Sequence, residues 1–243
     1  MTMLNKKNPD LAIDVSRLCF SWDGHDPLLE IDRLQIKRGE RIFIEGPSGS
    51  GKSTLLSLIA GVVTPQKGTI AINDKLISAL SGADRDRFRA DHIGFIYQMF
   101  NLIPYLSVVE NVTLPCRFSL RRRERAAARS SSFDAEAMRL LKSLGLDGAA
   151  VIKKPAHELS VGQQQRVAAA RTLIGSPEIF IADEPTSSLD TDHRKAFIRL
   201  LFQECDPAET TLVFVSHDTT LANIFDKTIR VADINRIKHL QTQ

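Results

Sequence analysis

The chain lacks long apolar segments and any sign of a targeting signal. No run of about eighteen consecutive apolar residues occurs, so the sequence predicts no membrane-spanning helix. Residues 1–10 are polar and lack the apolar core of a secretory signal peptide. We therefore expect a protein that stays in the cytoplasm.

Cysteine is scarce, and the chain has little net charge. Cys19, Cys116 and Cys205 stand far apart, which fits neither a disulfide framework nor a metal-binding cluster, so we expect ordinary reduced thiols. The formal net charge is only +3 over 243 residues, so we expect no nucleic-acid partner. Composition otherwise indicates a globular protein with a sizeable core, and function must come from local sites.

One stretch near the start of the chain has the residue types that hold a triphosphate. It consists of Glu45, Gly46, Pro47, Ser48, Gly49, Ser50, Gly51, Lys52, Ser53 and Thr54. The glycines let backbone N–H groups approach phosphates, Lys52 would reach the β- and γ-phosphates, and Ser53 would ligate Mg²⁺. Residues 41–44 predict the strand before this loop and residues 55–59 the helix after it, which makes a chance Gly/Ser-rich turn a rare alternative.

An acidic pair follows a short apolar run later in the chain. Residues 179–182 predict a buried strand, and Asp183 and Glu184 come directly after it. Ligands of parallel sheets bind at the carboxyl ends of the strands, so we expect both carboxylates beside the phosphate loop. Asp183 is suited to hold Mg²⁺ and Glu184 to polarise the attacking water, although such carboxylates are often only the start of a loop.

A glutamine and a histidine also follow predicted strands. Gln98 ends the apolar stretch 93–97, where its amide oxygen could contact a metal or an attacking water. His217 follows 211–215, which we expect to be the last core strand, and it could hydrogen-bond the γ-phosphate. A surface glutamine and a structural histidine are the alternatives.

The order of the predicted elements indicates the fold class. Alternating β and α elements predict a mostly parallel sheet flanked by helices. Residues 11–36 alternate apolar and polar side chains, which predicts two strands joined by a polar loop. Trp22 lies in that loop region, where it could stack on an adenine base or simply be a partly buried strand residue.

The middle of the chain predicts helices and no convincing strand. Residues 99–154 therefore form a predicted helical lobe inserted into the sheet domain. The arginine-rich segment 121–125 could meet lipid headgroups or an acidic partner, and a solvated helix or loop is the alternative. Ser160 is a predicted N-cap for the alanine-rich segment 161–174. The positive end of that helix could bind the nucleotide of another subunit, or the helix could be an ordinary capped one.

Taken together and in this order, the stretches resemble an ATP-binding cassette (ABC) ATPase over roughly residues 11–231. The resemblance implies an α/β fold of the P-loop NTPase, RecA-like type, with an antiparallel β part and an inserted helical lobe. It implies one domain over 1–243, with a nucleotide-binding core at 1–98 and 166–243 and the lobe at 99–165.

The resemblance also implies ATP and Mg²⁺ as cofactors and a role for each site residue. The implied catalytic residues are Glu184, His217 and Gln98. The implied nucleotide-binding residues are Trp22, Gly46, Pro47, Ser48, Gly49, Ser50, Gly51, Lys52, Ser53 and Thr54, with Ser160, Gly162 and Gln163 closing on the partner's ATP. The implied metal ligands are Ser53, Gln98 and Asp183. Asp190 would lie in the loop that crosses the dimer interface.

Three positions depart from the common pattern of the family. Val161 replaces the first glycine of the usual Leu-Ser-Gly-Gly-Gln signature, and a β-branched residue there would be strained if the position needed a positive φ. Because Ser160 and Gly162 are kept, we expect a working site. Trp22 stands where tyrosine is common and Ser188 where alanine is common, and both replacements look harmless.

The resemblance further implies partners. One chain holds one phosphate loop and one signature, so it would form a homodimer or pair with a homologous ATPase subunit. It would couple ATP hydrolysis to a membrane permease on a separate chain, at the inner face of the cell membrane. Residues 95–104 and 106–112 resemble the branch of lipoprotein-releasing, macrolide-exporting and cell-division ATPases. A soluble ABC ATPase acting on ribosomes or nucleic acid, and the ATPase subunit of an importer, are the alternatives.

Overall fold

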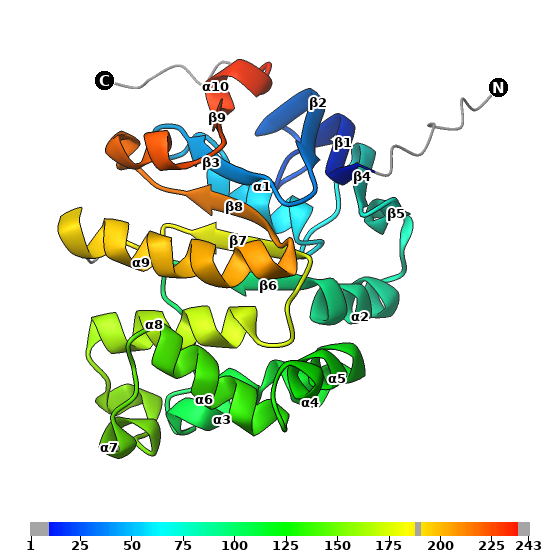
Figure 1. The fold of residues 1–243 in the computed structure, drawn as a ribbon. Helices are drawn as coiled ribbons and strands as arrows, with labels where there is room; N and C mark the ends of the chain where they lie inside the picture. Colours follow the sequence, from blue (N-terminus) through cyan, green and yellow to red (C-terminus); the bar gives the residue numbers. More distant parts are fainter. Residues whose placement is uncertain (1–9, 188–190, 238–243) are drawn as a thin grey trace.

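The computed structural model describes residues 10–187 and 191–237, and its central layer is a parallel sheet. The strands of the chain are β1 (Leu11–Phe20), β2 (Leu29–Lys37), β3 (Arg41–Glu45), β4 (Lys67–Ile72), β5 (Lys75–Leu76), β6 (Ile93–Ile96), β7 (Ile179–Asp183), β8 (Thr211–Val215) and β9 (Lys227–Arg230). Five of them form the parallel sheet in the order β6-β7-β8-β3-β9, which Figure 1 shows between layers of helices. The prediction of a mostly parallel sheet flanked by helices is confirmed.

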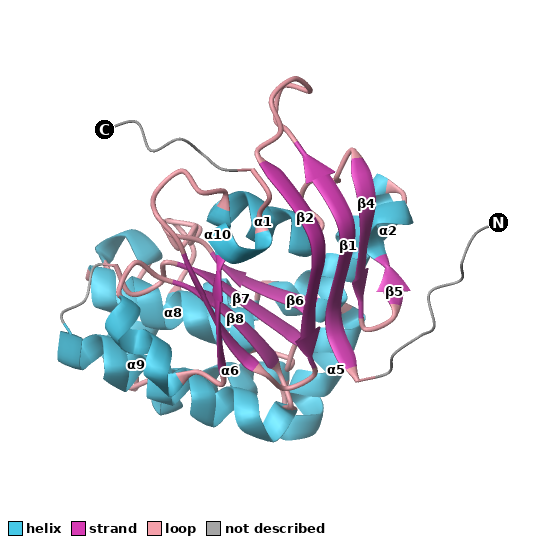
Figure 2. Ribbon diagram, turned by 90° about the horizontal axis from the view of Figure 1, so that it is seen from above, coloured by secondary structure: helices cyan, strands magenta, loops and turns pink. Residues whose placement is uncertain are grey.

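A second sheet is antiparallel, in the order β2-β1-β4-β5. Figure 2 shows it as a separate layer beside the parallel sheet. Strands β1 and β2 pair over nearly their whole length, from Leu11 opposite Lys37 to Phe20 opposite Leu29. The two strands and the polar loop expected in this region are therefore present.

The prediction that residues 211–215 form the last core strand is wrong. Strand β9 follows and pairs in parallel with β3, with Ile42 opposite Lys227 and Ile44 opposite Ile229. Its sequence has three polar residues out of four, and only Ile229 is buried. A short edge strand of this kind lacks the apolar run that marks a buried strand in a sequence.

Helices flank the parallel sheet and form the lobe. They are α1 (Lys52–Ile59), α2 (Gly82–His92), α3 (Val108–Thr113), α4 (Pro115–Phe118), α5 (Leu120–Arg129), α6 (Phe133–Ser143), α7 (Ala149–Ile152), α8 (Val161–Leu173), α9 (Thr191–Cys205) and α10 (Val231–Ile234). In Figure 1, α3 to α7 gather on the side of the sheet away from the antiparallel layer. Helix α8 runs across the predicted lobe boundary at residue 165, which stays a prediction.

In the part of the chain that the structure describes, no helix combines the length and the apolar character needed to cross a membrane.

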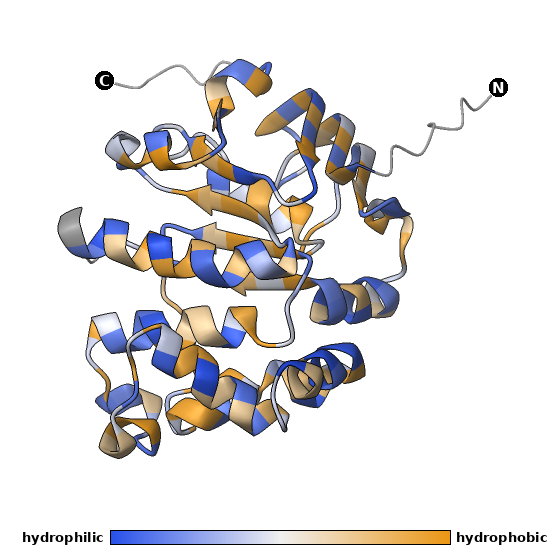
Figure 3. Ribbon diagram, viewed as in Figure 1, coloured by the Kyte–Doolittle hydropathy of each residue, from blue (hydrophilic) through white to orange (hydrophobic). Residues whose placement is uncertain are grey.

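The two faces of the parallel sheet pack against different layers. Side chains alternate along each strand, and Figure 3 shows the central strands as largely hydrophobic. On one face, residues such as Ile44 and Val213 pack with α1 and the antiparallel sheet. On the other, residues such as Phe43 and Phe214 pack with α8, α9 and the lobe. Burial on both faces explains why these strands read as continuous apolar runs.

The arginine-rich helix α5 contacts the end of α8 and the segment that leads from it to β7, residues 172–178. The arginines that make these contacts are Arg121, Arg122, Arg125 and Arg129. Arg123 instead lies over the Phe133 ring. Its guanidinium carbon is 5.3 Å from the ring centroid, within the reach of about 6 Å for a cation–π contact. The run of arginines is therefore bound within the chain, and its side chains are not simply a solvated face.

The three cysteines are free thiols, as expected from their isolation. Burial raises the pKa of Cys116 to about 11 and that of Cys205 to about 12. Both buried thiols therefore stay protonated at neutral pH and are poor nucleophiles.

Candidate nucleotide-binding and hydrolysis site

The phosphate loop joins β3 to α1, as the sequence predicted. Gly49 and Gly51 have φ values of 79° and 91°, and α1 begins directly after Gly51. The Lys52 ammonium is buried and donates hydrogen bonds to the carbonyls of Gly46 (2.7 Å) and Pro47 (2.9 Å). Burial lowers the pKa of Lys52, and the negative charges of two neighbouring carboxylates oppose that shift. The loop thus wraps around its own lysine.

Two of the loop glycines have a steric reason as well as a conformational one. A Cβ on Gly51 would lie 2.8 Å from Cδ2 of Leu29, and the left-handed φ would strain any other residue. A Cβ on Gly46 would lie 2.7 Å from the Ser50 hydroxyl, which is buried and has no hydrogen-bond partner within the described part of the chain. The loop can therefore adopt this conformation without strain only with glycine at positions 46 and 51.

The end of β7 brings Asp183 to the first turn of α1. The Asp183 carboxylate is buried and accepts a hydrogen bond from the Ser53 hydroxyl. Burial raises the pKa of Asp183, while that hydrogen bond and the charges of Lys52 and His217 oppose the shift. The two residues expected to hold Mg²⁺ from these elements are thus in contact.

Glu184 and His217 meet across neighbouring strand ends. Glu184 Oε1 lies 2.5 Å from His217 Nε2, and the Glu184 backbone N–H donates to the carbonyl of Val215. Glu184 has a φ of 49°, which is uncommon for a residue other than glycine. Such backbone strain gathers at functional sites, where the surrounding structure holds it in place.

A cavity of about 290 Å³ lies between these elements. It is lined by Leu28, Ser48, Gly49, Gly51, Lys52, Ser53, Thr54, Gln98, Glu184 and His217. Residues from three strand ends and from α1 therefore converge as the sequence predicted. Leu28 was missed; it ends the polar loop before β2, and its apolar side chain gave no signal of a ligand.

Trp22 is not among the residues that line this cavity. Its ring packs edge-on against Phe20, with 5.1 Å between ring centroids, and 64% of the residue is exposed. Gly46 and Pro47 line a neighbouring cavity of about 390 Å³, which His217 also borders. Asp190 and Ser188 lie outside the described residues.

The signature stretch forms the start of α8 and does not line the phosphate-loop cavity. The Ser160 hydroxyl accepts a hydrogen bond from the Gln163 backbone N–H, and the Gln163 side chain accepts one from the Ser160 N–H. Val161 is the first helical residue and is 53% exposed. It is not among the described residues with a positive φ, so its backbone carries no left-handed strain. A Cβ on Gly162 would meet open space within 4 Å. Packing within the described part of this chain therefore does not require a glycine at position 162.

The comparisons with known proteins agree with this geometry. Residues 29–187 match the family described as ABC transporter. The chain is 38% identical to the lipoprotein-releasing system ATP-binding protein LolD of Syntrophotalea carbinolica, over 91% of this chain and 95% of that protein. It is 40% identical to the ABC transporter ATP-binding protein YtrE of Bacillus subtilis, over 82% of each.

A solved structure is also similar. It is the dimeric post-hydrolysis state of the ATP-binding cassette MJ0796 of Methanocaldococcus jannaschii, bound to ADP and Pi. It aligns with a TM-score of 0.76 and 34% sequence identity, over 90% of this chain and 93% of that one.

The phosphate loop, the buried Asp183 and the Glu184–His217 contact at the carboxyl edge of a parallel sheet define a P-loop nucleoside triphosphatase. Within that class, this chain belongs to the ABC transporter family, as an ATP-binding subunit that hydrolyses ATP. The resemblance that the motifs indicated is confirmed.

Proposed function

We propose that this ATPase powers a membrane complex of the lipoprotein-release, export or force-transmission type, with its permease on a separate chain. The observation that carries the proposal is the convergence of Lys52, Ser53, Gln98, Glu184 and His217 on one cavity. The type of complex is supported by the likeness to a lipoprotein-releasing ATP-binding protein along almost the whole chain. The ATPase would then sit at the inner face of the membrane, bound to that permease.

Within this proposal, the chain's own residues divide the work of hydrolysis. Lys52 and the backbone N–H groups of the loop hold the phosphates, and Glu184 polarises the water that attacks the γ-phosphate. His217 contacts the Glu184 carboxylate at 2.5 Å, which fixes the direction of that carboxylate. Gln98 lines the same cavity from the end of β6, where its amide oxygen would contact the metal ion or orient the attacking water.

The residues around Ser53 suit a magnesium ion. Ser53 and Asp183 supply a hydroxyl and a carboxylate in contact, and Gln98 adds an amide oxygen to the same cavity. Hard oxygen donors of this kind are what Mg²⁺ prefers, usually together with phosphates and water. When bound, the ion would neutralise charge on the phosphates; Ser53 and Asp183 would hold it.

Dimerisation would complete the nucleotide site. Ser160 and Gly162 lie outside their own chain's cavity, at an exposed helix start where the space beside Gly162 is open. The positive end of a helix favours phosphate oxygens, and a glycine there permits close approach. A second copy, or a homologous subunit, would place that helix start against the nucleotide held by the first.

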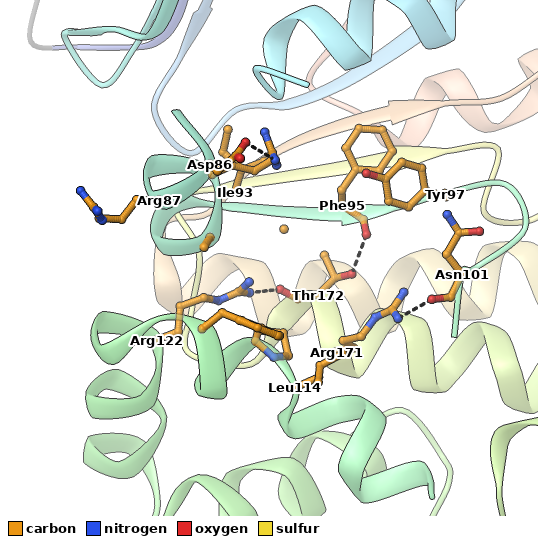
Figure 4. Close-up of a pocket in the computed structure, with 15 residues that line it drawn as sticks. Asp86, Arg87, Ile93, Phe95, Tyr97, Asn101, Leu114, Arg122, Arg171 and Thr172 are labelled. Atoms are coloured by element: carbon orange, nitrogen blue, oxygen red, sulfur yellow. Dashed lines mark hydrogen bonds and ion pairs between the residues drawn. The ribbon is translucent and has the colours of Figure 1, made fainter. Parts of the chain in front are cut away.

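The permease would dock in the cleft between the sheet core and the lobe, which has a volume of about 680 Å³ (Figure 4). Apolar side chains such as Ile93, Leu114 and Phe118 line it, and Phe118 is 74% exposed. Its charged lining residues are four arginines and one aspartate. This lining fits a short permease segment that carries apolar side chains and a carboxylate.

The Glu184→Gln variant tests the proposed function. We expect it to bind ATP but to hydrolyse it at least about a hundredfold more slowly, because the group that polarises the water is lost. Tagged and trapped with ATP in gently solubilised cells, it should co-purify with a permease. Ribosomes or nucleic acid without a membrane protein would overturn the transporter proposal, and an unchanged rate would overturn the role of Glu184.

A second variant tests the docking cleft. Phe118→Glu should abolish co-purification of the permease, since it places a charge on the exposed apolar side of the cleft. Leu76→Glu is the matched control, because Leu76 is also an exposed apolar residue (42%) but does not line the cleft. Equal loss in both variants would contradict docking at this cleft.

A further inference from the structure

The loop that follows Gln98 contains two consecutive residues in the left-handed region. Phe100 has a φ of 59° and Asn101 a φ of 47°. Asparagine tolerates this conformation, but a bulky phenylalanine is a genuine outlier. Two backbone hydrogen bonds form tight turns within the loop. The Phe100 N–H donates to the Tyr97 carbonyl at 2.8 Å, and the Asn101 N–H donates to the Met99 carbonyl at 2.7 Å. Something outside the loop has to hold it in this strained form.

Arg171, near the end of helix α8, contacts both strained residues. Its Nη1 donates to the Asn101 carbonyl at 2.7 Å and its Nη2 to the Phe100 carbonyl at 2.5 Å. Figure 4 shows the guanidinium reaching up from α8 to this loop. The planar fork of arginine suits two neighbouring carbonyls, because its donors stand in a fixed geometry that the freely rotating ammonium of lysine lacks. Two charge-assisted hydrogen bonds therefore fix the carbonyl directions of the loop.

The guanidinium makes these contacts at an electrostatic cost. Burial lowers the pKa of Arg171, so the charged form has lost part of its hydration. Among residues 10–187 and 191–237, no carboxylate forms an ion pair with it. A charge kept in such a place without a counter-ion is costly, and its hydrogen bonds here go to a single loop.

We propose that Arg171 is a positioning residue that sets Gln98 in the hydrolysis site by clamping the Phe100–Asn101 turn. The proposal rests on the role of Gln98 in the proposed function. Gln98 lines the nucleotide cavity, whereas Arg171 and Asn101 line the cleft proposed to receive the permease. Since α8 also begins with the signature stretch at Ser160, one helix connects the cleft, the Gln98 loop and the partner's nucleotide.

A double-mutant cycle tests the inference with the purified full chain and Mg-ATP. Arg171→Met keeps a long apolar side chain and removes both donors; we expect kcat to fall about tenfold with little change in the KM for ATP, because Gln98 is misplaced. In a chain that already carries Gln98→Ala, the same change should alter kcat by less than about twofold. Residues that act through one another give such non-additive effects.

Arg122→Met is the matched control. Arg122 is also buried and donates to the carbonyls of Thr172 and Ile174 in the same helix region, but not to the Gln98 loop. In the double variant, the fold-change in kcat caused by Arg122→Met should multiply with the fold-change caused by Gln98→Ala, as expected for residues that act independently. Thermal unfolding shows whether each variant folds. If Arg171→Met does not, Arg171→Lys replaces it, because an ammonium keeps the charge but lacks the rigid planar fork that fixes the directions of the two carbonyls.

Two results would overturn the inference, and they are distinguishable. If the effects of Arg171→Met and Gln98→Ala multiply, Arg171 does not act through Gln98, and only this inference fails. If Gln98→Ala leaves kcat unchanged, the role of Gln98 in the proposed function fails and the inference falls with it.

Discussion

The two helices that begin at the phosphate loop and at the signature stretch, α1 and α8, start in opposite ways. Helix α1 begins after a left-handed Gly51, with Lys52 buried among the carbonyls of its own loop. Helix α8 begins with an exposed Ser160–Gln163 capping box, in which its own side chains satisfy the first N–H groups. The first helix start has no side-chain cap and faces the nucleotide cavity of its own chain, whereas the second caps itself and lies exposed outside that cavity.

The two helices also differ in what holds them. All but two residues of α1 are buried, between the parallel and antiparallel sheets. Helix α8 packs against the lobe, and the segment after it is bound by arginines of α5. Apolar burial holds most of α1, whereas α8 combines apolar burial, as at Val167 and Leu173, with arginine hydrogen bonds to the segment that follows it. This difference predicts distinct effects of substitutions at the two helices.

The largest effect is expected at the enclosed start of α1. Lys52→Ala should weaken ATP binding by roughly a hundredfold, because a buried charge that reaches the phosphates is lost. Calorimetric titration with ATP measures it, and Lys67→Ala, at an exposed lysine, is the control. Unchanged affinity would contradict the assignment of the phosphate loop.

The next effect concerns the polar contacts beyond α8 and depends on pH. Burial alone would raise the pKa of Glu178, but hydrogen bonds from His92 and Arg121 and the charge of Arg125 lower it to about 2 from an ordinary 4.5. Because the pKa of Glu178 is lower in the folded than in the unfolded chain, its ionised carboxylate stabilises the fold fully above pH 4.5. This stabilisation is lost as the pH falls from 4.5 toward about 2.

Glu178→Gln should therefore lower the free energy of unfolding by on the order of 2–3 kcal/mol near pH 7, with a smaller difference from the native chain near pH 3. Urea denaturation at both pH values measures this. Glu124→Gln, at an exposed glutamate of α5, should show little change at either pH. A difference that does not shrink in acid would contradict the ion-pair account.

A paired glycine test sharpens the comparison directly. Gly51→Ala should lower the free energy of unfolding by roughly 1–3 kcal/mol, because of the left-handed φ and the contact with Leu29. Gly162→Ala should leave it within about 0.5 kcal/mol, since its Cβ meets open space, but should slow ATP hydrolysis if a partner's nucleotide comes close. Thermal unfolding and ATPase rates separate the two outcomes; a strongly destabilised Gly162→Ala would break the comparison.

The smallest effect is expected at Val161. Val161 is an exposed residue in the first turn of α8 and has no backbone strain for a glycine to relieve. Val161→Gly should therefore lower the free energy of unfolding by about 0.5 kcal/mol, because glycine has a lower helix propensity. The ATPase rate should change by less than about twofold. A rate several times higher would mean that the valine side chain restricts closure on the nucleotide.

Much of the fold and site could be predicted from the sequence because the signals are local. The phosphate loop, the two acids at the end of β7 and the histidine beyond β8 each come where a buried apolar strand ends, and parallel strand ends meet at one edge of the sheet. Strand β9 gave no such signal, since only Ile229 of its four residues is buried. The partners of the α5 arginines lie some fifty residues further on and include three backbone carbonyls, which have no sequence signature.

The sequence by itself determined the kind of site in this protein: glycines that let the backbone fold around a lysine, and carboxylates directly after apolar strands. These depend on neighbours along the chain, which set backbone freedom and strand burial. Only the tertiary structure decided that Glu184 meets His217, that Trp22 lies outside the nucleotide cavity, and that Arg171 holds the loop after Gln98. Those contacts join elements distant in the sequence, and packing of helices on the sheet fixes their distances.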